Sequence, residues 1–169
     1  MDAKGLCAIF SFGSILGECS KAAIDRLAGA IKAGQVQVEA VTLPQWDEAT
    51  YRFRFSEGTG AHKGLCAQCA IWLESRGHSW GHRAYDYPGG RADLVSDDGT
   101  LAVECGYTKA SKVNDALERG VNVLVAPYSL DDTAYLFTGR MMPDTEPEEA
   151  RRKVLRGVHV PYLRKGARP

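Results

Sequence analysis

Two acidic residues in neighbouring short segments are the strongest sign of chemistry in this sequence. Asp93 stands in RADLVSD and Glu104 in TLAVECGY, and an Asp-Gly turn joins the two segments. Short apolar segments joined by such a turn are typical of paired strands. We therefore expect the two carboxylates to converge across an antiparallel pair.

A divalent cation would explain why two acids occupy such a place. Apolar neighbours cannot compensate a buried carboxylate, and two adjacent carboxylates repel each other. Mg²⁺ (or Mn²⁺) relieves both costs, because it binds one or two carboxylates and keeps water and substrate phosphate in its other positions. Asp93 and Glu104 are thus candidate metal ligands and catalytic residues. The simpler alternative for Asp93 is a bond to the backbone or to Arg91, whereas a buried glutamate is rare unless paired.

The pattern around these acids predicts an alternation of helix and strand. From 61 to 128 the predicted order is α-β-β-β-α-β, with the last strand fully buried. The predicted elements are a helix over 61–76, strands over 78–87, 91–97 and 100–107, a helix over 110–120 and a strand over 121–128.

The two ends of the chain are predicted to be appendages to this core. Residues 1–57 predict a β-α-β-β extension, the last segment of a core over 58–140 is a strand or a helix, and 141–169 predict a basic helix and tail. The predicted elements outside 61–128 are strands over 5–12, 35–41 and 51–55, helices over 21–33 and near 147–156, and the undecided segment 133–142. The length of 169 residues allows one sizeable α/β core.

The element order and the two acids together resemble the PD-(D/E)XK nuclease superfamily, which has the restriction-endonuclease-like fold. The resemblance covers 61–128 and matches Asp93 to the family's aspartate and Glu104 to the glutamate of its E-x-K tripeptide. It implies divalent-metal-dependent hydrolysis of a nucleic-acid phosphodiester, with DNA as the expected substrate. It also implies a lysine that orients water or neutralises charge.

The strand lysine of the tripeptide is replaced by Gly106 in this chain. A glycine leaves space at that position, and lysines displaced onto a neighbouring element are a variation that the resemblance allows. Lys112, one turn into the following helix, is our preferred replacement, and Lys109 is the second candidate. His62, at the start of the first helix, is a further residue that could contribute to the site.

Charge is distributed unevenly along the chain. Residues 1–150 hold 14 basic and 21 acidic residues, whereas 151–169 hold seven basic and no acidic ones, so the net charge of zero divides into −7 and +7. A basic tail favours contact with nucleic-acid phosphates, although it can equally fold onto its own acidic body. The candidate nucleic-acid-binding residues are Arg83, Arg91, Arg151, Arg152, Lys153, Arg156, Arg164 and Lys165.

The five cysteines fit reduced, buried thiols better than a disulfide framework. Cys66 and Cys69 with His62 have the spacing of zinc ligands, with a fourth from His78, His82 or Cys105, but the same residues more simply form a helix core. No apolar run is long enough for a membrane span, so we expect a cytoplasmic protein without a membrane partner.

The sequence leaves rival functions open. A catalytically degenerate member of the same fold would bind nucleic acid or a protein partner, as an inhibitor or accessory subunit, and the missing strand lysine and acidic body favour it. A third interpretation is a homodimer-forming subunit of a larger nucleoprotein complex.

Overall fold

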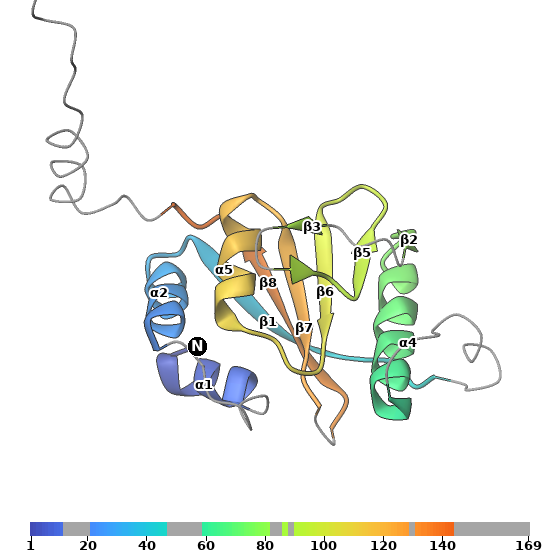
Figure 1. Ribbon diagram of the computed structural model, residues 1–169. Helices are drawn as coiled ribbons and strands as arrows, with labels where there is room; N and C mark the ends of the chain where they lie inside the picture. The colour runs from blue at the N-terminus through green and yellow to red at the C-terminus, as the bar shows by residue number, and fades with distance from the viewer. Residues whose placement is uncertain (12–20, 47–58, 82–85, 88–89, 129–130, 144–169) are drawn as a thin grey trace, which may run out of the picture.

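A computed structural model describes residues 1–11, 21–46, 59–81, 86–87, 90–128 and 131–143. It is a mixed α/β protein with four helices and a six-stranded sheet among these residues (Figure 1). The helices are α1 (Ala3–Ser11), α2 (Lys21–Lys32), α4 (Gly60–Ser75) and α5 (Ala110–Glu118). The strands are β1 (Val36–Thr42), β2 (Trp80–Gly81), β3 (Asp86–Tyr87), β4 (Gly90–Arg91), β5 (Leu94–Ser96), β6 (Leu101–Cys105), β7 (Asn122–Ala126) and β8 (Thr133–Gly139).

The sheet runs in the order β1-β8-β7-β6-β5-β2 and is mostly antiparallel. Its one parallel pair in the described chain is β6 with β7. Two parallel neighbours require a crossover connection, and α5 supplies it between these strands. The small strands β3 and β4 form a separate antiparallel pair. The start of β5 and the end of β6 therefore lie at the same end of the strand pair, and the chain passes from the end of β6 into α5.

Helices cover both faces of the sheet, and β6 shows how its side chains divide between them. Leu101, Val103 and Cys105 pack in the cluster that includes α4, whereas Ala102 packs in the cluster that includes α1, α2 and α5. Successive side chains of a strand point to opposite faces, so the alternation builds two cores from one strand. Figure 1 shows α4 on one side of the sheet and the other three helices on the opposite side.

Local signals in the sequence explain the helix around which the site is built. Thr59 caps α4, because its side-chain oxygen accepts a hydrogen bond from the backbone N of His62. Gly77 follows α4 with a φ of 80°, a conformation that favours glycine and ends the helix. No helix in the described part of the chain has both the length and the apolar character that a bilayer crossing requires.

The prediction of a mixed α/β protein is confirmed, as are the helices predicted over 21–33, 61–76 and 110–120. The strand predicted over 5–12 is wrong, because the segment is helix α1. Leu6, Ile9 and Phe10 are buried at helical spacing, and Asp2 Oδ1 accepts a hydrogen bond from the Gly5 backbone N at the start of this helix.

Strand predictions in the second half of the chain hold in most places. The undecided segment 133–142 contains strand β8, and the strand predicted over 121–128 is the buried β7. Within the strand predicted over 78–87 the structure describes β2 and β3, and residues 82–85 between them lie outside the described chain. The strand predicted over 51–55 and the helix predicted near 147–156 lie outside the described residues.

Candidate functional site

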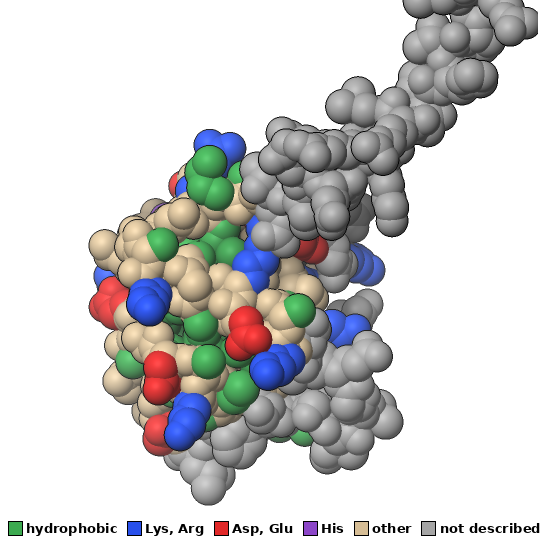
Figure 2. Space-filling view, turned by 90° about the vertical axis from the view of Figure 1, so that its left-hand side faces the viewer, with side chains coloured by type: hydrophobic (Ala, Val, Ile, Leu, Met, Phe, Trp, Pro, Cys, Tyr) green, Lys and Arg blue, Asp and Glu red, His purple; other side chains and the backbone are tan. Residues whose placement is uncertain are grey.

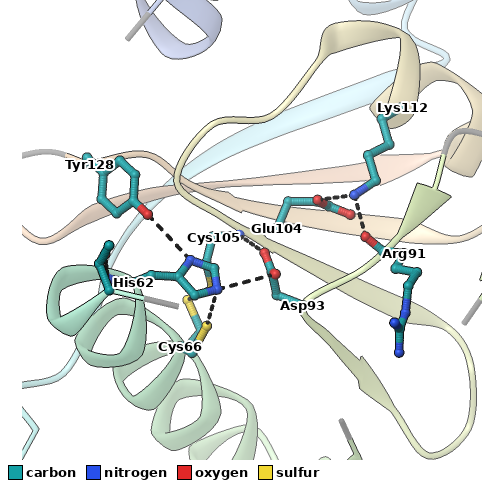
Figure 3. A network of polar contacts seen from close by, with 10 residues as sticks. His62, Cys66, Arg91, Asp93, Glu104, Cys105, Lys112 and Tyr128 are labelled. Atoms are coloured by element: carbon teal, nitrogen blue, oxygen red, sulfur yellow. Dashed lines mark hydrogen bonds and ion pairs between the residues drawn. The ribbon is translucent and has the colours of Figure 1, made fainter. Parts of the chain in front are cut away.

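Buried Glu104 and partly buried Lys112 form an ion pair at the end of β6. Lys112 Nζ lies 2.5 Å from Glu104 Oε2 and 2.5 Å from the backbone O of Arg91 (Figure 3). The side chain of Lys112 is 16% exposed and that of Glu104 is 4% exposed. Alternation along β6 turns Glu104 toward α5, and Lys112 stands one turn into that helix, so the amine reaches the strand end from the neighbouring element.

Gly106 shows why the lysine comes from the helix. Its φ is 85°, and a Cβ atom built there would lie 2.6 Å from the ring of Tyr128. Such a contact is too short for any side chain, so a lysine at this position would have to displace the ring. The space that the glycine was expected to leave is therefore filled by Tyr128, and the amine is supplied by Lys112 from α5.

Asp93 stands at an irregularity of the strand that leads into β5. Leu94 is the partner of Val103, yet the backbone N of Asp93 also donates to Val103 O at 2.9 Å. Ala92 and Leu94, two residues apart, pack in the clusters on opposite sides of the sheet, whereas a regular strand would keep them on one side. These features indicate one extra residue in the strand, as in a β-bulge, which re-aims the Asp93 side chain.

The Asp93 carboxylate contacts the α4 side of the site. The backbone N of Cys105 donates to Asp93 Oδ2 at 2.6 Å, and His62 Nε2 lies 3.5 Å from Asp93 Oδ1. The second ring nitrogen of His62, Nδ1, lies 3.4 Å from the hydroxyl of Tyr128. Figure 3 shows this chain of contacts from Tyr128 through His62 to Asp93. Both nitrogens of the imidazole thus have a partner, which fixes the orientation of the ring.

The structure therefore brings the two acids to the same end of the strand pair but engages them with different helices. Glu104 is bound by Lys112 of α5, and Asp93 contacts His62 of α4. Within the described residues, no three His, Cys, Asp or Glu side chains are arranged to hold a metal ion. The donor chemistry nevertheless fits Mg²⁺, which takes one or two carboxylates from a protein and completes its coordination with water.

The other predicted site residues lie further out or outside the described chain. Lys109 is exposed and is the N-cap residue of α5, and the side chain of Arg91 is exposed. On the face formed by α1, α2 and α5, charges of both signs are scattered among the described side chains rather than gathered into one basic patch (Figure 2). Arg83, Arg151, Arg152, Lys153, Arg156, Arg164 and Lys165 fall outside the described residues.

The cysteines pack in the core between α4 and β6. Cys66, Cys69 and Cys105 are buried thiols, as predicted, and Cys105 Sγ lies 3.8 Å from Cys69 Sγ. The prediction of burial is wrong for Cys7, which is exposed on α1, and Cys19 lies outside the described residues. The hydrogen bond with Cys105, together with burial, raises the pKa of the Cys66 thiol. The three buried cysteines belong to the apolar cluster between α4 and the sheet, where a buried cysteine behaves as a small core side chain.

Tyr128 is the site residue that the sequence did not single out. It follows the buried strand β7 by two residues, where it contacts both Gly106 and His62. Its place at the carboxyl end of a central strand, next to Pro127, is a signal that could have marked it.

Searches of protein-family models, curated proteins and solved structures found no match to this chain.

Proposed function

We propose that this protein is a divalent-metal-dependent phosphodiesterase that acts on nucleic acid, with DNA as the expected substrate. The observation that carries the proposal is the contact between Lys112 and Glu104 at the end of β6, one strand away from Asp93. Asp93, Glu104 and Lys112 together supply the chemical groups that phosphoryl transfer requires, namely oxygen ligands for a cation and a positive charge for the developing anion.

The order of the elements supports the same proposal. From α4 to β7 the sheet order is β2-β5-β6-β7, with β5 antiparallel to both its neighbours and β6 parallel to β7. Apart from the small β3-β4 pair, the chain passes through one helix, three strands, a helix and a strand, which is the order that the resemblance to the PD-(D/E)XK superfamily rests on. The displaced lysine also has a physical reason, because Tyr128 blocks the strand position.

Each residue of the group has a role in this proposal. Asp93 and Glu104 would hold Mg²⁺, which supplies Lewis acidity and lowers the pKa of bound water. Lys112 neutralises negative charge that builds up on the phosphoryl oxygens. His62 holds the Asp93 carboxylate, and Tyr128 holds His62, so both act through Asp93 as positioning residues.

The test is cleavage of plasmid and single-stranded DNA with Mg²⁺ or Mn²⁺ by the wild type and by Glu104→Gln. We expect the substitution to lower the cleavage rate at least about a hundredfold, because it removes a charged group from the reacting centre. Glu118→Gln is the matched control, since it changes a half-exposed glutamate that pairs with Arg26 on α2. Circular dichroism verifies that both variants are folded. Equal cleavage by the wild type and Glu104→Gln would refute the proposal.

A catalytically degenerate protein of the same fold is the second candidate. The observation that favours it is that the two acids contact different helices, Asp93 through His62 of α4 and Glu104 through Lys112 of α5. Such a protein would shift nucleic acid in an electrophoretic mobility assay, or bind a protein partner, without turnover under any metal condition. DNA cleavage that Glu104→Gln abolishes would exclude this candidate.

A further inference from the structure

A pocket of about 360 Å³ lies on the α4 side of the sheet, next to the candidate site. Trp46, Leu65, Pro127 and Tyr128 give it aromatic and apolar walls. Gln68 and Asp132 bring polar groups to it. The volume and the mixture of apolar walls with a few polar groups are typical of sites for small organic groups.

Two of the walls are aromatic rings that glycines hold in place. A Cβ on Gly64 would lie 3.0 Å from the ring of Trp46, and a Cβ on Gly106 would lie 2.6 Å from the ring of Tyr128. Both rings therefore pack directly against backbone that only glycine can present so closely. Because the two rings are already held in place, a ligand that stacks on them loses little side-chain conformational entropy on binding. Their flat surfaces favour a flat ligand.

The polar part of the pocket is built around Asp132. Its two carboxylate oxygens accept hydrogen bonds from Gln68 Nε2 at 2.8 Å and Gln45 Nε2 at 2.7 Å. The φ of Asp132 is 51°, a strained conformation that tends to persist at binding sites. Gln68 is only 7% exposed although it lines the pocket. A carboxylate in this position repels phosphate and attracts a neutral group with N–H donors at its edge.

Tyr128 connects the pocket to the candidate catalytic residues. Its ring lines the pocket, while its hydroxyl lies 3.4 Å from His62 Nδ1 and His62 Nε2 lies 3.5 Å from Asp93. Tyr107 contacts the same ring in an edge-to-face arrangement with centroids 5.1 Å apart, and it is 59% exposed. The pocket thus has a second, accessible aromatic surface beside it.

We propose that this pocket takes one unpaired nucleobase, so that the nucleic acid bound here is single-stranded near the cleavage site. Its role as a substrate subsite rests on the proposed function. A base has two flat faces for the aromatic walls and a hydrogen-bonding edge for Asp132 and Gln68. In a duplex that edge is paired and the faces are stacked, so only an unpaired nucleotide can place a base in the pocket.

The experiment measures binding of a labelled single strand and of the same sequence as a duplex, in EDTA so that nothing is cleaved. Ala61→Trp fills the pocket from an exposed lining position of α4, and Lys63→Trp is the matched control because Lys63 does not line the pocket. We expect the wild type and the control to bind the single strand about tenfold more tightly than the duplex. Ala61→Trp should lose this preference while keeping the wild-type circular dichroism spectrum.

A further variant separates this inference from the proposed hydrolysis. Glu104→Gln abolishes cleavage but should keep the preference for the single strand, because Glu104 does not line the pocket. An unchanged preference in folded Ala61→Trp would overturn the base pocket. If Ala61→Trp removes the preference but the wild type cleaves no nucleic acid, the base pocket is established and the proposed nuclease activity is refuted.

Discussion

Helix α5 carries an ion pair at each end, and the two pairs differ in burial. At its first turn Lys112 binds Glu104, with side chains 16% and 4% exposed, and at its last residue Glu118 binds Arg26 of α2, with side chains 25% and 22% exposed. The two charges on α5 itself, Lys112 near its N-terminus and Glu118 at its C-terminus, both oppose the helix dipole, which favours anions at the N-terminus and cations at the C-terminus. The helix dipole therefore explains the position of neither residue.

The difference between the two pairs separates a structural contact from a candidate functional one. The outer pair joins α2 to α5 and is partly exposed, so water reaches either partner more easily than it reaches Glu104. The inner pair keeps a carboxylate inside the core, where an apolar side chain of similar size would fill the same place without a desolvation cost. The pair of Glu104 and Lys112 therefore adds little stability compared with two apolar side chains of similar size.

The largest effect is expected from breaking the inner pair. Lys112→Met should lower the free energy of unfolding by about 3–5 kcal/mol, because it leaves the Glu104 carboxylate buried without its cation. Replacing both partners in Lys112→Met/Glu104→Met should recover most of that loss. Urea denaturation monitored by circular dichroism measures both. A loss below about 1 kcal/mol in the single variant would mean that the pair behaves as a surface contact.

A smaller effect is expected from the outer pair. Glu118→Ala should lower the free energy of unfolding by only about 0.2–1 kcal/mol, as exposed pairs do. Salt screens exposed charges more than buried ones, so the deficit of Glu118→Ala should shrink in 1 M NaCl (about 3 Å Debye length) while that of Lys112→Met persists. Denaturation at low and high salt makes this comparison. If salt reduces the stability deficits of Glu118→Ala and Lys112→Met equally, the pair of Lys112 and Glu104 is not the more buried of the two.

Much of the fold around the site could be predicted, because its elements carry local signals. Thr59 and Gly77 mark the two ends of α4, and the apolar run of β7 marks a buried strand. The strand prediction for the segment of α1 failed because the periodicity of a short apolar run fits a buried strand and a buried helix equally well. Whether this segment is a helix or a strand depends on how Leu6 and Ile9 pack against the rest of the core. These contacts cannot be predicted from the local sequence pattern.

The contacts of the candidate site residues could be predicted only in part from the sequence. The preference for Lys112 followed from helix geometry, and the structure places its amine on Glu104. The bulge at Asp93 could not be read from the sequence, because its neighbours would suit a regular strand equally well. Tyr128 was missed for a similar reason: its contact with Gly106 joins residues 22 positions apart and appears only once β6 and β7 are aligned.

A third carboxylate, in the turn between β5 and β6, extends the comparison to a charge held mainly by hydrogen bonds. Asp98 Oδ1 accepts hydrogen bonds from the Ser96 hydroxyl at 2.6 Å and from the backbone N and hydroxyl of Thr100 at 3.0 and 2.8 Å. These bonds lower the pKa of Asp98 from its ordinary value to about 2. Protonation would weaken them, so the ionised form stabilises the turn.

The sign of the pH dependence follows from this lowered pKa. The contribution of Asp98 is fully present above the unfolded pKa and is lost as the pH falls through the folded value, which places the loss between about pH 4 and pH 2. Asp98→Asn should therefore lose less stability than the wild type over this interval. Asp97→Asn is the control, because it removes a charge from the same turn without touching these three bonds. Urea midpoints at several pH values measure the effect, and parallel curves for the wild type and Asp98→Asn would show that the hydrogen bonds of the turn do not depend on its charge.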